Sequence, residues 1–402
     1  MQPAQRLAGA RFRPDACAVD WSRVDWAAVD RLRKLFLAGP APGRIYWQSQ
    51  AELETYDLTF AQRIGWKWDA VLRELELRGW RPPSGPVLDW GCGTGIAARR
   101  VLEFFGPEQF DQVWFYDHSV LATQFAVEVT RAEFGGLRIE PVGAGWLTSG
   151  EPIGLLLISH VLSELTQGAL QALLRLMDRA QSVIWVEPGT HADSRRLGSL
   201  RERLRRRFAV LAPCTHQAAC GILAPHNARH WCHFFAEAPP ALMADPDWAR
   251  FAQRAEVDLR SLPYSFLVLE KAHRGPIRQA QQPTSSCTVA CGGPSEAVRP
   301  DLIAAGVATA PSYSRVIGRP RFYKGLAKVF SCQLDGVLDL ILRERTAPDL
   351  FQDIQTRTEG LIYQWVRAGD EIRGGHRWST SSITSNQSYP PAPTEGSSKS
   401  AP

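Results

Sequence analysis

A short stretch of the chain is crowded with side chains that bind soft metal ions. Residues 211–235 read LAPCTHQAACGILAPHNARHWCHFF and hold three of the chain's eight cysteines and four of its nine histidines. Cys214, Cys220 and Cys232 have the spacing C-x5-C-x11-C. Zinc fingers and ribbons usually place two cysteines only about two to four residues apart. The wider spacing favours a larger inorganic group that is held by thiolates from separate loops, such as an iron–sulfur cluster.

Such a centre needs a fourth ligand, and the sequence offers several. Cys332 ends an expected strand, whereas Cys287 and Cys291 form a C-x3-C pair in a segment rich in Pro and Ser. His216 or His233 would instead complete a zinc site. The cysteines could also be reduced, buried thiols that lie beside unrelated histidines. Metal binding is favoured because a loop broken by Pro and Gly builds no core of its own, and the metal would contribute free energy of folding.

A second group of residues predicts a bound cofactor. The sequence VLDWGCGTGIAAR places Asp89, Gly91, Gly93 and Gly95 between an expected strand and an expected helix. Glycine lets backbone N–H groups approach a ligand closely, and a helix N-terminus favours negative charge. A dinucleotide-binding fingerprint would need glycine at position 96, which is Ile96. A turn that binds nothing is the alternative, but the order of strand, glycines and helix is the context in which such a motif binds.

The pattern D-x-G-x-G-x-G resembles motif I of class I S-adenosylmethionine-dependent methyltransferases. The resemblance implies that Asp89 and the three glycines bind S-adenosylmethionine, and that Asp117, at the end of VWFYD, accepts hydrogen bonds from its ribose. Asp117 could instead cap the next helix. Ser159 and His160 end the stretch GLLLISH, where the fourth strand of this fold would deliver groups that face the methyl acceptor, although His160 could equally be a core residue. The chain has no N-P-P-Y or D-P-P-Y stretch of the kind that some base methyltransferases use, and no general base is evident.

Alternating strands and helices would position these residues. Residues 1–80 are expected to be helical, and RPPSGP at 81–86 breaks the chain. Strands are then expected near 86–90, 112–117, 154–159, 181–187 and 263–271, and helices near 96–105, 120–134, 166–179 and 194–208. This alternation predicts an α/β fold with a mostly parallel, Rossmann-like sheet that is covered on both faces.

The remainder of the chain suggests a second, smaller unit. LAKVFSC and VLDLIL flank the turn QLDG, which predicts a hairpin in a small β-domain of barrel type. The last segment is rich in Ser, Thr and Pro, as in disordered tails. The expected organisation is a helical region (1–80), a core with the Cys-rich loop (81–274), a flexible linker (275–312), the β-domain (313–345), a C-terminal helix (346–372) and a disordered tail (373–402).

Composition limits the class of protein. The chain has 402 residues, of which 45% are hydrophobic, so it can bury a sizeable core. No secretory apolar segment follows Met1, and the longest apolar run, LLLISHVL, is far too short to cross a membrane. We expect a monomer in the bacterial cytoplasm, or in the mitochondrial matrix if the source is eukaryotic. Structural disulfides are rare in such compartments.

Basic residues gather in two segments that suit RNA. Residues 195–207 contain seven Arg and one Glu. Helical spacing places four apolar residues on one face: Leu197, Leu200, Leu204 and Phe208. It directs three arginines away from that face: Arg195, Arg203 and Arg206. A second patch combines cations with two aromatic side chains that can stack on bases: Arg315, Arg319, Arg321, Lys324, Lys328, Phe322 and Tyr323. Either segment could be a solvated surface, but the excess of positive charge favours contact with phosphate.

These pieces together resemble the methyltransferase-like family of small-ribosomal-subunit proteins of bacteria and mitochondria. The resemblance covers about residues 50–345 and rests on these stretches: LDWGCGTG, SHVLSEL, EPGT, APCTHQAAC, WCHF, PYSFLVLEK and RVIGRPRFYKG. It implies a four-iron cluster, [4Fe-4S], bound by Cys214, Cys220, Cys232 and Cys332, and a role in assembly of the small subunit with rRNA as a partner. The chain departs from the family where Gly221 replaces the proline that usually follows the second cysteine.

Three functions remain open on the sequence. The first is an S-adenosylmethionine-dependent methyltransferase that acts on small-subunit rRNA or on a ribosomal protein. The second is an assembly factor that keeps the fold, binds cofactor and RNA, and no longer transfers methyl groups. The missing acceptor motif favours the second. The third is a small-molecule methyltransferase in which zinc is a structural staple.

Overall fold

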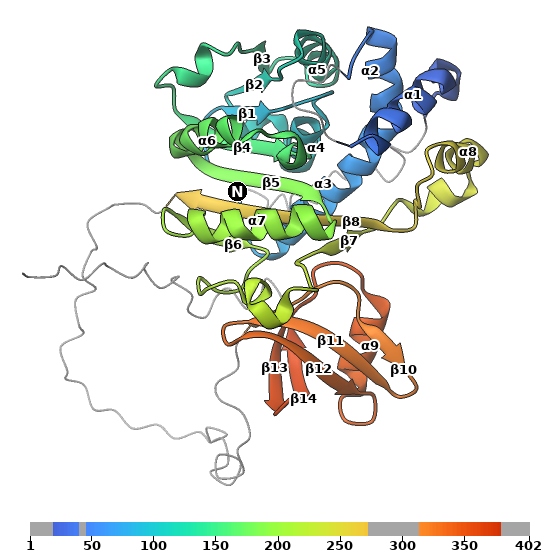
Figure 1. Ribbon diagram of the computed structural model, residues 1–402, viewed down its shortest axis with the longest axis vertical. Coiled ribbons are helices and arrows are strands. Elements are labelled where there is room, and N and C mark those ends of the chain that lie inside the picture. Colours follow the sequence, from blue (N-terminus) through green and yellow to red (C-terminus); the bar gives the residue numbers. More distant parts are fainter. Residues whose placement is uncertain (1–18, 40–45, 272–312, 379–402) are drawn as a thin grey trace, which may run out of the picture.

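The computed structural model describes residues 19–39, 46–271 and 313–378 (Figure 1). Within these residues an α/β core comes first and a small β-domain follows, packed against one side of the core. The expected linker at 275–312 falls outside the described residues, and so do Cys287, Cys291 and the expected tail beyond residue 378.

A mixed eight-stranded sheet forms the centre of the core. Its strands are β1 (Val87–Trp90), β2 (Gln112–Tyr116), β3 (Arg138–Pro141), β4 (Ile153–Ser159), β5 (Ala180–Pro188), β6 (Phe208–Ala212), β7 (Phe234–Ala236) and β8 (Leu262–Lys271). Their order is β3-β2-β1-β4-β5-β8-β6, and β7 pairs with β8. The strands from β3 to β5 are parallel, and β8 runs antiparallel to β5, β6 and β7. The order 3-2-1-4-5 is that of a doubly wound Rossmann-like sheet, so the predicted α/β fold class is confirmed.

Helices cover both faces of this sheet. They are α1 (Trp26–Leu37), α2 (Gln50–Leu58), α3 (Phe60–Leu77), α4 (Ile96–Phe105), α5 (Val120–Glu133), α6 (Gln167–Leu176), α7 (His191–Leu204) and α8 (Pro246–Arg254). Apolar side chains of α3, α4 and α5 pack in one cluster on one face, and those of α6 and α7 pack in a second cluster on the other. Thr190 caps α7 by accepting a hydrogen bond from the amide of Asp193, which explains why this helix begins before the predicted residue 194. Among the described residues, no helix combines the length and the apolar character that a membrane crossing requires.

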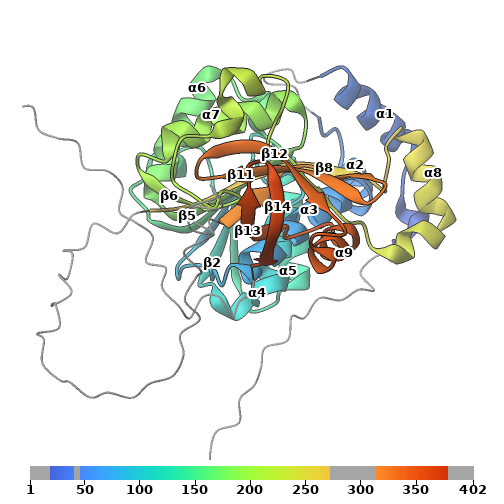
Figure 2. The ribbon, with the colours of Figure 1, turned by 90° about the horizontal axis from the view of Figure 1, so that it is seen from below.

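The β-domain is a six-stranded sheet that closes on itself. Its elements are β9 (Tyr313–Val316), β10 (Arg321–Tyr323), β11 (Leu326–Gln333), β12 (Gly336–Arg343), α9 (Pro348–Thr356), β13 (Ile362–Ala368) and β14 (Glu371–Arg377). The order is β10-β11-β12-β14-β13-β9, and the pairing of β9 with β11 completes the circuit. Figure 2 shows β11, β12, β13 and β14 of this domain from below. The expected hairpin around QLDG is present as β11 and β12, which confirms the barrel-like character of this domain.

The second half of the β-domain differs from the expected C-terminal helix at 346–372. The helix α9 is short, and the chain then forms β13 and β14, which extend to Arg377 into the segment that was expected to be disordered. In β13 the buried side chains Tyr363 and Trp365 alternate with more exposed ones and contribute to the barrel core. Their period of two residues therefore reflects a strand, although the spacing of apolar residues in LIYQWV also fits a helix.

Buried ion pairs join the β-domain to the core. The carboxylate of Glu74, in α3, accepts hydrogen bonds from Arg315 at 2.7 Å and from Arg78 at 2.8 Å. Nearby, Arg73 forms two hydrogen bonds of 2.8 Å to Glu359. Burial alone would raise the pKa of Glu74, but the two guanidinium groups overcome this and hold it below its usual value. Arg315 was expected to face RNA, and it is instead buried at this junction because it is the partner of Glu74.

Candidate cofactor cavity and cysteine cluster

The glycine motif forms a tight loop where β1 ends and α4 begins. Gly91 has a φ of 71° and Gly93 a φ of 53°, a region that L-residues rarely adopt. A Cβ atom on Gly91 would lie 2.6 Å from Cγ1 of Val161, so this loop also requires glycine for space. The amides of Gly91 and Cys92 donate to the carbonyl of Tyr116 at 2.7 and 3.0 Å, which fixes the loop against the end of β2.

Asp117 lies beside this loop, at the carboxyl end of β2. Its Oδ2 accepts a hydrogen bond of 3.0 Å from the amide of Gly93, and its Oδ1 accepts one of 2.9 Å from the amide of Ser119. The alternative that Asp117 caps α5 is not what the structure shows, because the side chain of Ser119 accepts from Ala122 as the cap. The carboxylate of Asp117 is therefore held in place at the edge of a cavity.

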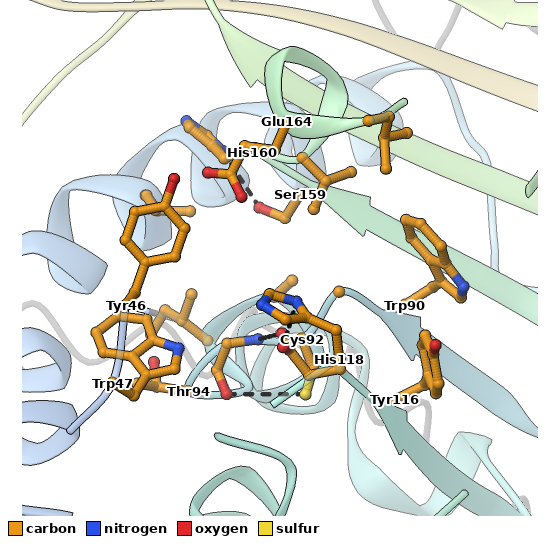
Figure 3. A pocket seen from close by; sticks show the side chains of 18 of the residues that line it. Tyr46, Trp47, Trp90, Cys92, Thr94, Tyr116, His118, Ser159, His160 and Glu164 are labelled. Carbon is orange, nitrogen blue, oxygen red and sulfur yellow. Dashed lines mark hydrogen bonds and ion pairs between the residues drawn. The ribbon is translucent and has the colours of Figure 1, made fainter. Parts of the chain in front are cut away.

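This cavity has a volume of about 340 Å³ and opens at the carboxyl ends of β1 and β4, the paired neighbours at which the strand order reverses. That is the switch point at which Rossmann-like sheets bind their ligands. Aromatic side chains form two of its walls (Figure 3). The lining aromatic residues are Phe36, Tyr46, Trp47, Tyr56, Trp90 and Tyr116. Trp90 and Tyr116 are stacked with ring centroids 6.0 Å apart, and such faces suit a planar heterocycle.

The structure brings five of the seven predicted cofactor and acceptor residues to the cavity wall: Gly91, Gly93, Asp117, Ser159 and His160. Asp89 and Gly95 are not among the lining residues. Asp89 is fully buried under the loop, where its Oδ2 accepts from the amide of Ala98 at 3.2 Å and so holds the first turn of α4. Burial, with a contribution from the charge of Asp117, raises the pKa of Asp89 to about 8. Direct contact of Asp89 with the cofactor stays a prediction.

Ser159 and His160 form a chain of polar contacts with α3. Trp68 Nε1 donates to Ser159 Oγ at 2.9 Å, and this oxygen lies 3.3 Å from His160 Nδ1. On the other side of the ring, Lys67 Nζ lies 3.1 Å from His160 Nε2. His160 has a φ of 55°, which is uncommon for a residue other than glycine and indicates that its position is enforced by its surroundings.

The protonation of this chain follows from its burial. Burial, and then the positive charge of Arg63, lowers the pKa of Lys67 to about 7. Burial and Lys67 also hold the pKa of His160 well below its usual range, so the imidazole is neutral. A protonated Lys67 can only donate, so Nε2 then accepts and Nδ1 carries the ring proton. Ser159 Oγ in that state accepts from Trp68 and His160, which leaves its own proton for a ligand in the cavity.

Glu187 supports the same loop from the end of β5. Its Oε1 accepts hydrogen bonds from the amides of Val161 and Leu162, at 3.3 and 3.0 Å, and from the Trp185 indole at 2.6 Å. Burial raises the pKa of Glu187 to about 8. Sequence reasoning missed Glu187, Lys67 and the N-terminal aromatic wall of the cavity. The one available signal for Lys67 was a lysine between two tryptophans in a predicted helix.

The four predicted metal-binding cysteines converge between the core and the β-domain. All four are free thiols, and Cys220, Cys232 and Cys332 pack in one small apolar cluster. Burial, and then Cys214 and Cys220, raises the pKa of the Cys332 thiol well above its usual range, so Cys214 also lies within electrostatic reach. His216 Nε2 is 3.6 Å from Cys332 Sγ. Within the described ranges, no group of three or more Cys, His, Asp or Glu side chains has the arrangement of a metal-ion site.

Arginines hold the cysteine loop in place. Buried Arg201 donates to the carbonyl of His216, and Arg195 donates to the carbonyls of Ile222, Asn227 and His230. Arg195 was expected to point away from the protein, and it faces the loop because these carbonyls need donors. Arg203 and Arg206 are exposed, as expected.

Several solved structures are similar to this chain. Among solved structures, a putative RNA methyltransferase from Pyrococcus horikoshii is 12% identical with a TM-score of 0.31, over 61% of this chain and 98% of that one. A putative class I S-adenosylmethionine-dependent methyltransferase from Listeria monocytogenes is 11% identical with a TM-score of 0.34, over 63% and 72%. TrmK of M. capricolum, solved with S-adenosyl-homocysteine, is 11% identical with a TM-score of 0.27, over 50% and 68%. No curated protein matches the chain significantly.

One family of proteins matches the chain over most of its length. The family is described as mitochondrial small ribosomal subunit Rsm22, and the match spans residues 61–364, about three quarters of the sequence. That span contains the glycine loop, the cysteine loop and most of the β-domain. The chain therefore belongs to the Rsm22 family of mitochondrial small-ribosomal-subunit proteins.

Proposed function

We propose that this protein binds S-adenosylmethionine in the cavity and methylates rRNA or a ribosomal protein of the small ribosomal subunit. The observation that carries the proposal is the carboxylate of Asp117, which the amides of Gly93 and Ser119 fix at the cavity edge. A fixed carboxylate beside a glycine loop is suited to accept hydrogen bonds from the two hydroxyls of a ribose. Membership of the Rsm22 family supports the small subunit as the place of action.

The cavity residues fit the proposed ligand in their chemistry. When bound, S-adenosylmethionine supplies an electrophilic methyl group. The rings of Trp90 and Tyr116 offer apolar faces to an adenine, and the glycine loop allows backbone N–H groups to approach the ligand. Ser159 would donate its hydroxyl proton into the cavity and so orient an acceptor group.

A second candidate is an assembly factor that binds the cofactor and RNA without transferring methyl groups. One observation favours it: both ring nitrogens of His160 are engaged, Nδ1 by Ser159 and Nε2 by Lys67. Neither nitrogen is then free to take a proton from an acceptor. The third possibility, a small-molecule methyltransferase with structural zinc, would leave the family relationship without a role.

We also propose that Cys214, Cys220, Cys232 and Cys332 bind a four-iron cluster. Support comes from the thiols of Cys220, Cys232 and Cys332, which pack in one small apolar cluster, and from Cys214, which lies within electrostatic reach of Cys332. Burial raises the pKa of the Cys332 thiol well above its usual range, so binding of the metal would have to displace the proton and form the thiolate that metal ligands need. The cluster would join the cysteine loop to β11 and so stabilise the junction between the core and the β-domain.

The proposed partner is rRNA, and we propose that the protein acts as a monomer in the mitochondrial matrix, or in the cytoplasm if its source is bacterial. Exposed cations on α7 and in the β-domain support contact with RNA phosphates. Salt-sensitive co-sedimentation with small subunits is expected. Absence of co-sedimentation at low salt would favour the small-molecule alternative.

Complementation separates the first two functions. Cells that lack the protein would receive the parent chain, Asp117→Ala, or the control Asp258→Ala, which removes an exposed carboxylate that does not line the cavity. Two readouts are needed: incorporation of labelled methyl groups into small subunits, and the amount of mature small subunit. A methyltransferase requires that Asp117→Ala lose both. If maturation persists while cofactor binding is lost, the enzymatic function is refuted and the assembly factor remains.

A further inference from the structure

The strand connections of the β-domain identify its fold. The first strand, β9, pairs antiparallel with both β11 and β13. The strands β11 and β12 form a hairpin, α9 lies between β12 and β13, and β12 pairs with β14 in parallel. Five strands in the circuit 1-2-3-5-4-1, with a helix after the third, form the Greek-key barrel of an OB-fold. In OB-folds the face of strands 2 and 3, with the adjoining loops, binds oligonucleotides or oligosaccharides.

In this chain that face belongs to β11 and β12, extended by the edge strand β10. Directly opposed residues of neighbouring strands point to the same side of a sheet. Arg321 and Ile341 lie opposite Lys328, and Tyr323 and Arg343 lie opposite Leu326. The intervening residues of β11 and β12 point into the barrel: Ala327, Val329, Leu340 and Leu342. The outer side therefore carries cations and an aromatic ring.

One end of this outer side is covered and the other is open. Near the covered end, Cys332 and Val337 pack with residues of the cysteine loop, and the ring of Phe330 lies 4.7 Å from that of His230. At the open end the side chain of Tyr323 is 54% exposed, and all of β10 is exposed. Figure 1 shows β10 at the outer rim of the domain.

The charge of the open end favours an anionic partner. Two of its acids are engaged by cations, because Arg321 pairs with Asp339 and Arg343 pairs with Glu371, whereas Glu344, beside Gly325, forms no ion pair within the described residues. Within the described parts of the chain, Lys324 and Lys328 have no hydrogen bond or ion pair of their side chains. Two free cations beside an exposed aromatic ring are typical of surfaces that bind nucleic-acid backbones and stack unpaired bases.

We propose that this open end, the hairpin face, binds single-stranded RNA. The hairpin face is defined by Arg321, Tyr323, Lys324, Lys328, Ile341 and Arg343. Tyr323 stacks on an unpaired base, and Lys324 and Lys328 contact the flanking phosphates. The proposal deepens the proposed function by naming the RNA contact, and it rests on that function only for the ribosomal origin of the RNA. A duplex is disfavoured because paired bases present no open face to Tyr323.

The test is equilibrium binding of a fluorescent single-stranded RNA of about 12 nucleotides to the full chain, within the range of known OB-fold sites. Tyr323→Ala is expected to weaken binding by about 5-fold to 150-fold, because the stacked base loses its platform. Tyr323→Phe keeps the ring and should bind within about twofold of the parent. Lys328→Ala should reduce the slope of log affinity against log salt by about 0.7. The control Lys34→Ala removes an exposed cation of α1 and should change neither value.

Two results of the binding measurement would overturn the proposal. One is unchanged RNA affinity in Tyr323→Ala, and the other is a double-stranded RNA that competes as well as the single strand. Ultraviolet cross-linking of the parent protein to the same RNA, with mapping of the linked peptide, gives a readout that needs no variant; a linked peptide outside β10–β12 would also overturn it. Binding of S-adenosyl-homocysteine by each variant is measured in parallel. Because Tyr323 lies outside the cavity, loss of RNA binding with intact cofactor binding separates this proposal from the proposed function.

Discussion

Nζ of Lys67 lies 3.1 Å from Nε2 of His160, and this contact joins α3 to the turn that closes the cofactor cavity. The side chain of Lys67 is buried, and that of His160 is half-buried at the cavity wall. A lysine in such a place must either lose its proton or keep a charge in an apolar environment. The pH at which Lys67 loses its proton therefore tests whether this lysine is buried behind the cavity wall.

We predict that the stability of the protein rises with pH through the titration of Lys67, and that Lys67→Met abolishes this rise. Burial lowers the pKa of Lys67 from 10.5 to about 7. Below about pH 7 both the folded and the unfolded states hold the proton, and the folded state carries the cost of a buried charge. Between about pH 7 and about pH 10.5 only the unfolded chain holds it, so the free energy of unfolding of the parent increases.

Urea unfolding across this pH range measures the effect. The parent and Lys67→Met differ in their free energy of unfolding, and this difference should change by about 2–5 kcal/mol between about pH 7 and about pH 10.5. The size follows from 1.36 kcal/mol per pKa unit. Lys34→Met, on the exposed face of α1, should run parallel to the parent. Parallel curves for Lys67→Met as well would show that Lys67 keeps an ordinary pKa.

We predict that a side chain at position 91 weakens cofactor binding because it meets Val161, and that a smaller residue at position 161 restores part of the binding. A Cβ atom there would meet Cγ1 of Val161 at 2.6 Å, in addition to the strain of a φ of 71°. Gly91→Ala should therefore displace the loop and weaken binding of S-adenosyl-homocysteine by at least about tenfold. Val161→Ala removes the atom in the way, so the double variant should regain part of the lost affinity. If the double variant binds no better than Gly91→Ala, backbone strain and not contact decides the effect.

Gly93→Ala is the matched control for this experiment. Its φ of 53° is also in the left-handed region, but a Cβ atom there meets nothing within 4 Å. The expected cost is the conformational strain alone, roughly 1–2 kcal/mol. Melting temperatures of the single variants show whether a change in affinity reflects the loop or the whole fold.

The ion pairs of Glu74 are predicted to stabilise the junction of the two domains. Glu74→Ala would leave the guanidinium groups of Arg78 and Arg315 buried beside an apolar side chain. Removal of one partner from a buried ion pair typically costs about 3–5 kcal/mol, and we expect a loss of that order in urea unfolding. Glu359→Ala breaks the ion pair with Arg73, which is more exposed than the pairs of Glu74, and should cost less. A loss below about 1 kcal/mol for Glu74→Ala would mean that the arginines find other acceptors.

Iron content tests the cysteine cluster independently of the cavity. Protein purified without oxygen should contain about four iron and four sulfide per chain, and Cys332→Ser should lose most of both. Cys92→Ser is the matched control, because Cys92 is a buried thiol of the glycine loop and not of the cluster. One tightly bound zinc per chain without sulfide, or full iron content in Cys332→Ser, would contradict the proposed cluster.

Much of the core could be predicted because its signals are local. The run IGLLLIS is apolar at almost every position, as a central parallel strand requires, and β4 was expected within one residue of its observed start. The glycine loop and Asp117 were found for the same reason, since each immediately follows a strand. The long-range relationships were not visible: Lys67 meets His160 across 93 positions of the sequence. The spacing of apolar residues along the chain carries no information about such a contact.

The β-domain shows the same limit. Arg315 looked like part of a basic surface because the sequence shows its charge and not its partner, Glu74, which lies 241 residues away. The segment of β13 was assigned to a helix because its short apolar run fits either period. Closure of the barrel, in which β13 pairs with β9, decides between the two. The pairing of β13 with its neighbouring strands therefore decides its secondary structure, which the local sequence pattern leaves ambiguous.

The central claim is that Asp117 and the glycine loop hold a nucleoside-containing methyl donor, and calorimetric titration of S-adenosyl-homocysteine into the full chain tests it most directly. The parent should bind one equivalent. Asp117→Ala should bind about 10-fold to 150-fold more weakly, the range expected when hydrogen bonds to a charged group worth ~1.5–3 kcal/mol are lost. Asp258→Ala should bind as the parent does. No binding by the parent, or equal binding by Asp117→Ala, would contradict the account.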